Sequence, residues 1–294
     1  MSLPAAFVSV ILIWSTTPLA IKWSAAGVSS SFSVLLRMLI GVMLCAALLA
    51  LFRVQLPLHR KALQAYLIGG LSMFSAMALT YWSAQYVSSG MIALLFGLSP
   101  LITSLGAMMW LKEETLTPSK TAGMLLGMLG LALVFKGGFS GQGNLLAGLA
   151  ALLLAVVAQA LGLVWLKRIG DDSPPLATTF GILLVALPLF FAAWYWEDGH
   201  MPSVWPSRAM AAIMYLGSFG SVLGFALYYY LIKHMEAGRI ALITLMTPVL
   251  ALLLGHGLNN EEIQLHVWFG TGCILLGLGV HRWGSLWVQR FSSK

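Results

Sequence analysis

The side chains of this sequence that could bind a small molecule lie within long apolar stretches and do not form a cluster of acids and bases. Arg37 is the one basic residue inside such a stretch, and its guanidinium could attract a carboxylate. The alternative is that its aliphatic stem carries the charge to the nearest end of the stretch. All nine acidic residues fall in connections or at the ends of stretches. The interiors of the apolar stretches therefore contain one residue that could bind a negatively charged group, and they contain no acid–base pair for catalysis.

Two prolines with a hydroxyl neighbour, Pro100 and Pro248, lie near the middle of apolar stretches. Each removes an amide that would bond the carbonyl four residues earlier. Freed carbonyls and neighbouring hydroxyls can line a wet cavity, the setting in which unpaired backbone is tolerated within a membrane. A plain kink satisfied by neighbouring helices is the alternative. The cavity residues expected here are Ser99, Pro100, Thr244, Thr247 and Pro248.

Aromatic and amide side chains supply the remaining candidates. Helical spacing puts Gln85 on the face that carries Tyr81, and Tyr81 recurs as Tyr229 in a second copy of the same pattern. Trp14 and Gln159 occupy similar positions in the two halves of the chain. Such a lining would suit neutral, amphipathic substrates, which stack on rings and bond to hydroxyls. The alternative is ordinary helix packing or an aromatic belt at the membrane surface.

Composition places these residues in a membrane. The chain of 294 residues is 60% hydrophobic and 9% charged, against about 25% charged residues in an ordinary soluble domain. Its apolar stretches run to about 20 residues, enough to cross a hydrocarbon core of roughly 30 Å. The sequence predicts an all-α integral membrane protein of ten transmembrane helices. The expected spans are residues 3–22, 32–52, 62–85, 88–110, 118–136, 145–167, 175–196, 209–232, 238–257 and 264–283.

Lysine and arginine predict the orientation. With the N-terminus placed in the cytoplasm, twelve basic residues fall on the cytoplasmic side, against Lys22, Lys136 and Arg208 on the other. Cytoplasmic connections of membrane proteins carry this excess, so both termini are expected in the cytoplasm. The net charge of +7 therefore indicates topology, and no basic stripe or aromatic motif for nucleic acid accompanies it.

An internal repeat appears when the chain is compared with itself. At an offset of 148, Gly90–Pro100 lies over Gly238–Pro248, and Gly, Ile, Ala, Leu and Pro match. The glutamate pair 113–114 then falls on the pair 261–262. In the last span of each half the offset is 147, where the glycines match: Gly123 with Gly270, and Gly130 with Gly277.

The repeat divides the chain into two halves of five helices each, residues 1–140 and 141–294. Because five is odd, the second half must enter the membrane from the opposite side. Inverted repeats give secondary transporters two mirror-related states, one open to each side of the membrane. The predicted function is therefore secondary transport by alternating access.

The sequence resembles the drug/metabolite transporter superfamily, in particular its ten-helix branch of two EamA-type repeats. The resemblance covers almost the whole chain. It rests on Trp14-Ser-Thr-Thr-Pro18 with Lys22 in the first span, on Arg37 early in the second, and on the block from Ala78 to Glu113 with its second copy. Within the superfamily, the tryptophan-rich spans are most similar to bacterial amino-acid exporters of the YddG type.

This resemblance implies export of amino acids, including aromatic ones, and related metabolites across the inner (cytoplasmic) membrane through a central cavity. Small multidrug members bind protons and cations through a glutamate in their first helix, where this chain has Trp14 to Thr17. A facilitator or exchanger is therefore expected. Two alternatives stay open: a sugar, nucleotide-sugar or organic-phosphate exchanger, and a proton-coupled drug exporter. Strongly anionic substrates would need several buried basic residues, and only Arg37 is available.

Other function classes lack their residues. An intramembrane enzyme would need a His-Glu-x-x-His helix, paired aspartates or an activated serine, so no catalysis is predicted. A channel would need rings of charge or carbonyl filters. His256 and His281 lie apart from other ligand types, so no metal or cofactor is expected. The expected partners are the small-molecule substrate and the lipid bilayer, with no nucleic acid and with a monomer as the functional unit.

Overall fold

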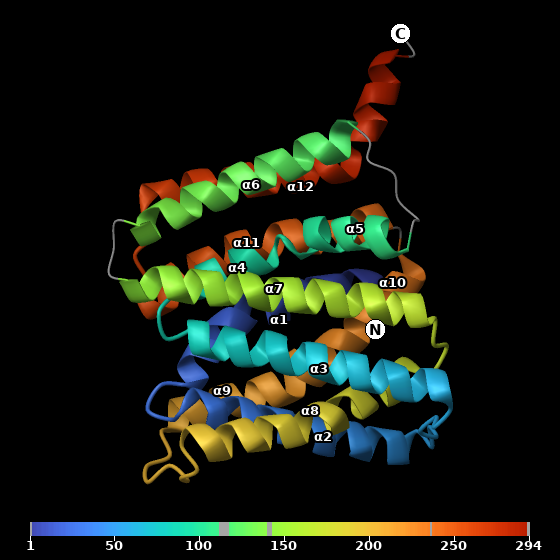
Figure 1. Cartoon of the computed structure of the whole chain (residues 1–294), viewed down its shortest axis with the longest axis vertical. Helices are drawn as coiled ribbons and strands as arrows, with labels where there is room; N and C mark the ends of the chain where they lie inside the picture. The colour runs from blue at the N-terminus through green and yellow to red at the C-terminus, as the bar shows by residue number, and fades with distance from the viewer. Residues whose placement is uncertain (1, 112–117, 140–142, 236, 293–294) are drawn as a thin grey trace.

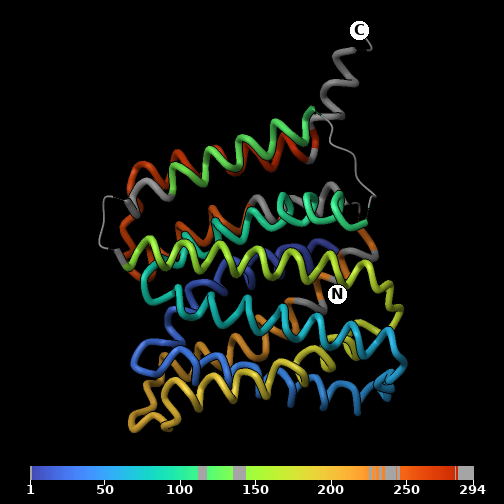
Figure 2. The backbone as a smooth tube through the Cα atoms, in the orientation of Figure 1, coloured from blue at the N-terminus to red at the C-terminus, as the bar shows by residue number. Residues whose placement is uncertain are grey.

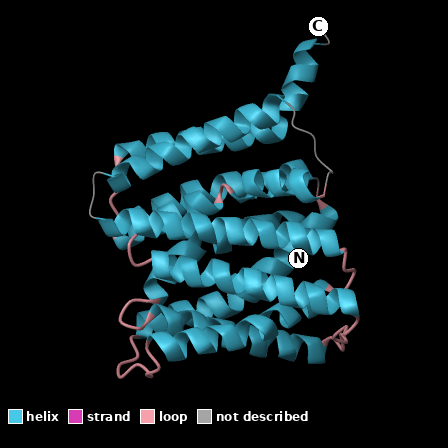
Figure 3. Ribbon diagram, viewed as in Figure 1, coloured by secondary structure: helices cyan, strands magenta, loops and turns pink. Residues whose placement is uncertain are grey.

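The computed structural model describes the backbone of residues 2–111, 118–139, 143–235 and 237–292. All regular structure in these ranges is helical (Figure 3). The helices are α1 (Leu3–Ser24), α2 (Ser30–Leu51), α3 (Arg60–Ser83), α4 (Ser89–Phe96), α5 (Ser99–Trp110), α6 (Pro118–Phe139), α7 (Gly143–Ile169), α8 (Pro175–Glu197), α9 (Ser207–Tyr215), the π-helix η1 (Leu216–Leu223), α10 (Gly224–His234), α11 (Ala237–Asn259) and α12 (Leu265–Ser292).

These helices confirm the ten expected spans within the described ranges. Eight spans are single helices, the fourth is α4 followed by α5, and the eighth is α9, η1 and α10 in succession. Several begin at a side chain that caps the helix: Ser29, His59 and Ser88 each accept a hydrogen bond from the amide three residues later. Among the described residues, six helical spans are long and apolar enough to cross a membrane by length and composition alone.

The helices lie side by side, and their connections gather at two ends (Figure 1). We call these the terminal end and the opposite end. The terminal end holds the N-terminus and the connections 52–59 and 170–174, and the opposite end holds the connections 25–29, 84–88, 198–206 and 260–264. In a membrane, each end would therefore face one of the two aqueous compartments.

The packing of α6 against α12 demonstrates the inversion of the second half. A Cβ added to Gly123 would lie 2.5 Å from the carbonyl oxygen of Gly277, and one added to Gly130 would lie 2.6 Å from that of Gly270. Residue numbers rise along α6 as they fall along α12, so the two helices are antiparallel neighbours (Figure 2). In the repeat, Gly123 corresponds to Gly270 and Gly130 to Gly277. The contact between Gly123 and Gly277 is therefore the repeat equivalent of the contact between Gly130 and Gly270. The two inverted five-helix repeats are confirmed.

The other helix contacts follow the same exchange. α3 packs against α7 and α8, and the eighth span packs against α1 and α2 in the corresponding way. α1 packs against α11, as α7 packs against α5. The main buried core lies where the halves meet, and it includes Leu94 and Leu95 of α4 and Leu149 and Leu152 of α7. The site must therefore be built from helices of both halves.

Candidate functional site

The polar run of the first span faces the eighth span. The rings of Trp14 and Tyr228 lie 4.7 Å apart between centroids, and the hydroxyls of Thr16 and Tyr215 lie 2.6 Å apart. A Cβ on Gly224 would lie 3.2 Å from the indole nitrogen of Trp14. The absence of a side chain at Gly224 thus allows α1 and α10 to approach closely, and an aromatic and hydroxyl surface results.

Arg37 is buried within this part of the bundle and does not extend to the membrane surface. The residue is 5% exposed, and its Nε donates to the hydroxyl of Ser221 on η1 at 3.1 Å. Its Nη1 is buried without a hydrogen-bond partner among the described residues. A Cβ on Gly220 would lie 3.7 Å from both Arg37 Nη2 and Thr17 Oγ1. The guanidinium therefore lies between α2, η1 and α1.

A one-residue difference between the halves accounts for η1. A Cβ on Gly70 of α3 would meet the carbonyl oxygen of Ile182 at 3.1 Å, and a Cβ on Gly217 would meet that of Arg37 at 3.2 Å. Gly70 thus corresponds to Gly217, and Ile182 to Arg37. Tyr81 comes eleven positions after Gly70. Its repeat partner, Tyr229, comes twelve positions after Gly217, so the second half holds one residue more in this stretch. A π-turn holds one residue more than an α-turn, and such turns are frequent at functional sites.

The two prolines of the repeat, Pro100 and Pro248, lie near each other at the interface of the halves. α4 ends at Phe96 and α5 begins at Ser99, with Pro100 in the first turn of α5. Across the interface, a Cβ on Gly97 would lie 3.2 Å from Cγ of Pro248. The hydroxyl of Ser99 is buried without a partner in the described part of the chain. Pro248 differs, because it lies inside the continuous helix α11.

The hydroxyl of Thr247 bonds its own helix, at the carbonyl of Ile243 2.7 Å away. Its donor is therefore occupied in this structure, whereas that of Ser99 is not. The side chains of Tyr229 and Thr244, which were also expected to line the cavity, lie outside the described residues. The expected symmetric pair of proline sites is thus asymmetric where both can be compared.

Tyr81 and Gln85 do not share a helix face, contrary to the expectation from spacing. α3 ends at Ser83, and Gln85 lies in the following turn, where its amide donates to the hydroxyl of Ser30 at 3.3 Å. The prediction extended the helix two residues too far because an apolar stretch does not mark its last hydrogen-bonded turn. Tyr81 is 1% exposed, and its hydroxyl has no partner among the described residues.

Gln159 lies on a face of α7 that changes from buried to exposed along the helix. Leu152 and Val156 are fully buried on this face, whereas Gln159 and Leu163, each seven residues further, are exposed. A seven-residue step returns to nearly the same side of a helix. α7 runs from the opposite end to the terminal end (Figure 1). The inward face of α7 therefore becomes accessible toward the terminal end.

The opposite end holds a polar network around Glu261, whose side chain is 9% exposed. One carboxylate oxygen accepts from both the amide and the hydroxyl of Ser89, each at 2.8 Å. The other accepts from the side-chain amide of Asn259 at 3.0 Å and lies 3.9 Å from Lys22 Nζ. Lys22 also donates to the carbonyl of Val87 at 2.8 Å. We call Lys22, Ser89, Asn259 and Glu261 the end network.

The end network joins α1, the start of α4 and the end of α11. The carboxylate lies at the first turn of α4, where unpaired amides and the helix dipole favour a negative charge. The indole of Trp23 donates to Asn259 at 3.0 Å, and the guanidinium carbon of Arg208 lies 4.1 Å from the centroid of the Trp23 ring. Three helices that reach the centre of the bundle are thus fastened together at one end.

Sequence reasoning missed the end network. It identified Lys22 as part of a motif and the pair 261–262 as part of the repeat, but it did not predict that they meet. The contact joins residues 172 positions apart, from Ser89 to Glu261, and no local pattern encodes such a pairing. The corresponding pair 113–114 lies outside the described residues.

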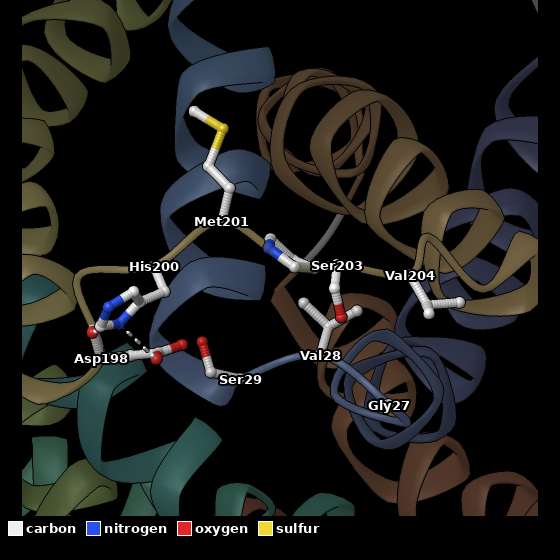
Figure 4. A pocket seen from close by; sticks show the side chains of 9 residues that line it. Gly27, Val28, Ser29, Asp198, His200, Met201, Ser203 and Val204 are labelled. Carbon is white, nitrogen blue, oxygen red and sulfur yellow. Dashed lines mark hydrogen bonds and ion pairs between the residues drawn. The ribbon is translucent and has the colours of Figure 1, made fainter.

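A surface pocket lies at the opposite end and contains none of the expected site residues. It has a volume of about 360 Å³ and lies between the connections 25–29 and 198–206 (Figure 4). Its lining includes His200 and Asp198, whose Nδ1 and Oδ1 atoms lie 3.7 Å apart. Its lining consists of loop residues, so it is not the interior site described above.

Comparison with known proteins identifies related chains. The model of the EamA-like transporter family matches residues 3–136 and 146–281. The uncharacterized inner membrane transporter YedA of Escherichia coli (strain K12) is 27% identical over 276 residues, which cover 93% of this chain and 88% of that one. The uncharacterized transporter YoaV of Bacillus subtilis is 23% identical over 275 residues, covering 92% and 93%.

A solved crystal structure has the same fold. It superposes with a TM-score of 0.67 at 22% sequence identity, and the match covers 99% of this chain and 98% of that chain.

Proposed function

The chain belongs to the EamA-like transporter family, and from that premise we propose that it is a secondary transporter of amino acids, including aromatic ones, and of similar small neutral or zwitterionic metabolites. It is a multi-pass membrane protein. In this proposal it exports its substrate by alternating access through the interior between the halves.

One observation carries the alternating-access part. The end network fastens α1, α4 and α11 at the opposite end, while the inward face of α7 becomes exposed toward the terminal end. A chain built of two inverted repeats can reach the mirror-related arrangement by exchanging the conformations of its halves. The described contacts fit a state that is closed at the opposite end.

The interior residues support the substrate class. Trp14, Tyr228 and Tyr215 offer rings and hydroxyls, and Arg37, whose guanidinium is the one buried among the described side chains, offers a positive charge. Substrates that carry a phosphate would call for several buried cations. The described acids lie outside the membrane interior, so a proton relay through a membrane carboxylate gains no support among those residues.

Position and organisation are part of the same proposal. We propose that the halves are residues 1–140 and 141–294, and that the protein is a monomer in the inner membrane with both termini in the cytoplasm. Support comes from the excess of lysine and arginine assigned to the terminal end, and from relatives that are named inner membrane transporters.

The first test is flux in proteoliposomes that contain the purified protein. Labelled tryptophan, phenylalanine, methionine and threonine are supplied with and without a proton gradient. We expect saturable flux that changes less than about twofold when a gradient is imposed, because no membrane carboxylate couples the proton. Flux that requires the gradient would contradict the uncoupled mechanism, and absence of amino-acid flux under both conditions would overturn the substrate class.

Tyr81→Phe separates a binding role from a structural one. The buried hydroxyl of Tyr81 has no described partner. Its removal should therefore leave the free energy of unfolding unchanged or raise it by up to about 1 kcal/mol. If the hydroxyl bonds the substrate, flux should fall about fivefold, the equivalent of one hydrogen bond of about 1 kcal/mol.

Tyr66→Phe on the same helix is the matched control. The hydroxyl of Tyr66 donates to the carbonyl of Pro57 at 2.9 Å, so its loss should lower stability by about 1 kcal/mol and leave flux unchanged. Equal flux for wild type and Tyr81→Phe would remove Tyr81 from the site.

A further inference from the structure

Arg37 carries a buried charge that the described residues do not neutralise. Its nearest described partner is the neutral hydroxyl of Ser221, and the ion pairs of the described chain do not include it. A guanidinium stays protonated in proteins. An unpaired charge in the membrane interior is costly and commonly marks a substrate pathway. The arrangement is therefore incomplete without an anion.

The internal repeat argues that packing does not require this charge. At the corresponding position of the second half stands Ile182, in the same contact with a glycine of the neighbouring span. The equivalent backbone position thus carries an aliphatic residue in the other half. The half that carries Arg37 also faces η1, whose additional residue lies opposite the guanidinium. The two halves thus differ twice at one place, by an arginine where the other half has isoleucine and by the additional residue of η1. Together these two differences place Arg37 beside Ser221.

We propose that Arg37 and Ser221 form the subsite for the single carboxylate of the substrate. Ser221 is a positioning residue that holds Nε and leaves the Nη edge of the guanidinium directed between η1 and α1. This inference rests on the proposed transport function and specifies its substrate class: small metabolites with one free carboxylate. A planar guanidinium matches a carboxylate with two parallel hydrogen bonds.

The subsite lies inside the closed end. Arg37 is seven residues from the start of α2, a depth of about 10 Å at 1.5 Å per residue. Thr17, the α1 residue nearest Gly220, is five residues from Lys22 along the helix. A carboxylate held by Arg37 would therefore lie between one and two turns inward of the end network. Opening of that network would expose the subsite to the opposite end.

The test compares phenylalanine with phenylalaninamide, which lacks the carboxylate. Unlabelled competitors are tested against labelled phenylalanine flux in proteoliposomes, and binding is followed by the thermal shift of the purified protein. For the wild type we expect phenylalanine to compete roughly 10- to 100-fold better than the amide, the range for a hydrogen bond to a charged group. Arg37→Ile should abolish flux and reduce the binding preference to about one.

Arg37→Ile should also fold. It removes an uncompensated buried charge and installs the residue type of the repeat partner, so its unfolding midpoint without ligand should equal or exceed that of the wild type. Arg60→Gln, which removes an exposed charge at the start of α3, is the control and should keep both flux and preference. Ser221→Ala should raise KM severalfold at unchanged kcat, and Ser221→Thr should restore it.

The outcomes distinguish the subsite from the transporter. Wild-type flux together with undiminished flux and preference in Arg37→Ile overturns the subsite and leaves the proposed function intact. Absence of wild-type flux and thermal shift for phenylalanine and the other amino acids overturns the proposed substrate class and the subsite together. Loss of preference in Arg37→Ile but not in Arg60→Gln supports both.

Discussion

Glu261→Gln should release the opposite end of the bundle. The substitution keeps the size of the side chain but removes the charge that faces Lys22 and the first turn of α4. Truncating one member of a buried, hydrogen-bonded charge pair costs about 2–5 kcal/mol. Glutamine retains part of the hydrogen bonding, so we expect the state with the end network formed to lose about 2 kcal/mol. This corresponds to roughly a 30-fold shift of the equilibrium toward the state in which the opposite end is open.

A single cysteine at Ile92 reports the opening. Ile92 lies one turn inside Ser89 and is 1% exposed, and the two native cysteines, Cys45 and Cys273, are first replaced by alanine. In nanodiscs, a membrane-impermeant maleimide should label this cysteine on the order of tenfold faster or more in Glu261→Gln, following the shift in the gate equilibrium.

The neighbouring glutamate supplies the control for this measurement. Glu262 is exposed and takes no part in the end network, so Glu262→Gln should leave the labelling rate unchanged. An equal labelling rate in Glu261→Gln and the wild type would show that the network does not hold the opposite end closed. Faster labelling in both variants would indicate a general loosening caused by lost charge.

Gly277→Leu should separate α12 from α6 and destabilise the protein severely. A Cβ at this position would lie 2.6 Å from the carbonyl oxygen of Gly123 and 2.8 Å from the amide nitrogen of Gly127. Both neighbours are backbone atoms, which no rotamer change can move. Overpacking usually costs about 1–3 kcal/mol, and contact with backbone on two sides places this variant at about 3 kcal/mol or above.

Gly279→Leu is the matched control, two residues along the same helix. A Cβ at Gly279 would meet nothing within 4 Å, and leucine is a better helix former than glycine by about 0.8 kcal/mol. The midpoint of thermal unfolding in detergent should fall by about 10 °C in Gly277→Leu and stay constant or rise in Gly279→Leu. Similar midpoints for the two variants would refute the proposed close approach of the backbones.

The helices and their repetition were predictable because they follow from local composition. Apolar stretches of membrane length predict spans wherever they occur. The expected and observed helix ends agree within three residues, except that α12 continues to Ser292, nine residues beyond the expected end at 283. The break between α4 and α5 follows from Pro100. The same proline chemistry at Pro248 produced no break, because α11 continues through it. Local sequence sets where a helix weakens, and its neighbours decide whether it separates into two.

The candidate site was predictable as a set of residues but not as an arrangement. Trp14 and Arg37 lie in the interior between the halves, whereas Gln85 lies in a turn at one end. The partner of Arg37 is Ser221, 184 residues away. The position of Ser221 depends on the additional residue of η1. That residue rotates part of the eighth span about its axis, compared with the equivalent part of the third span. A comparison of residue types cannot reveal that rotation.

By itself the sequence determined that the chain crosses a membrane through two inverted halves. The length of the apolar stretches and the odd number of helices in each repeat are properties of the chain alone. The tertiary structure decided which side chains meet at the opposite end and which of two neighbouring carboxylates joins them. Glu261 and Glu262 are chemically identical neighbours, yet one lies against Ser89 and Lys22 and the other is exposed. That choice depends on how α1, α4 and α11 are tilted and rotated, and these are set by packing between residues far apart in the sequence.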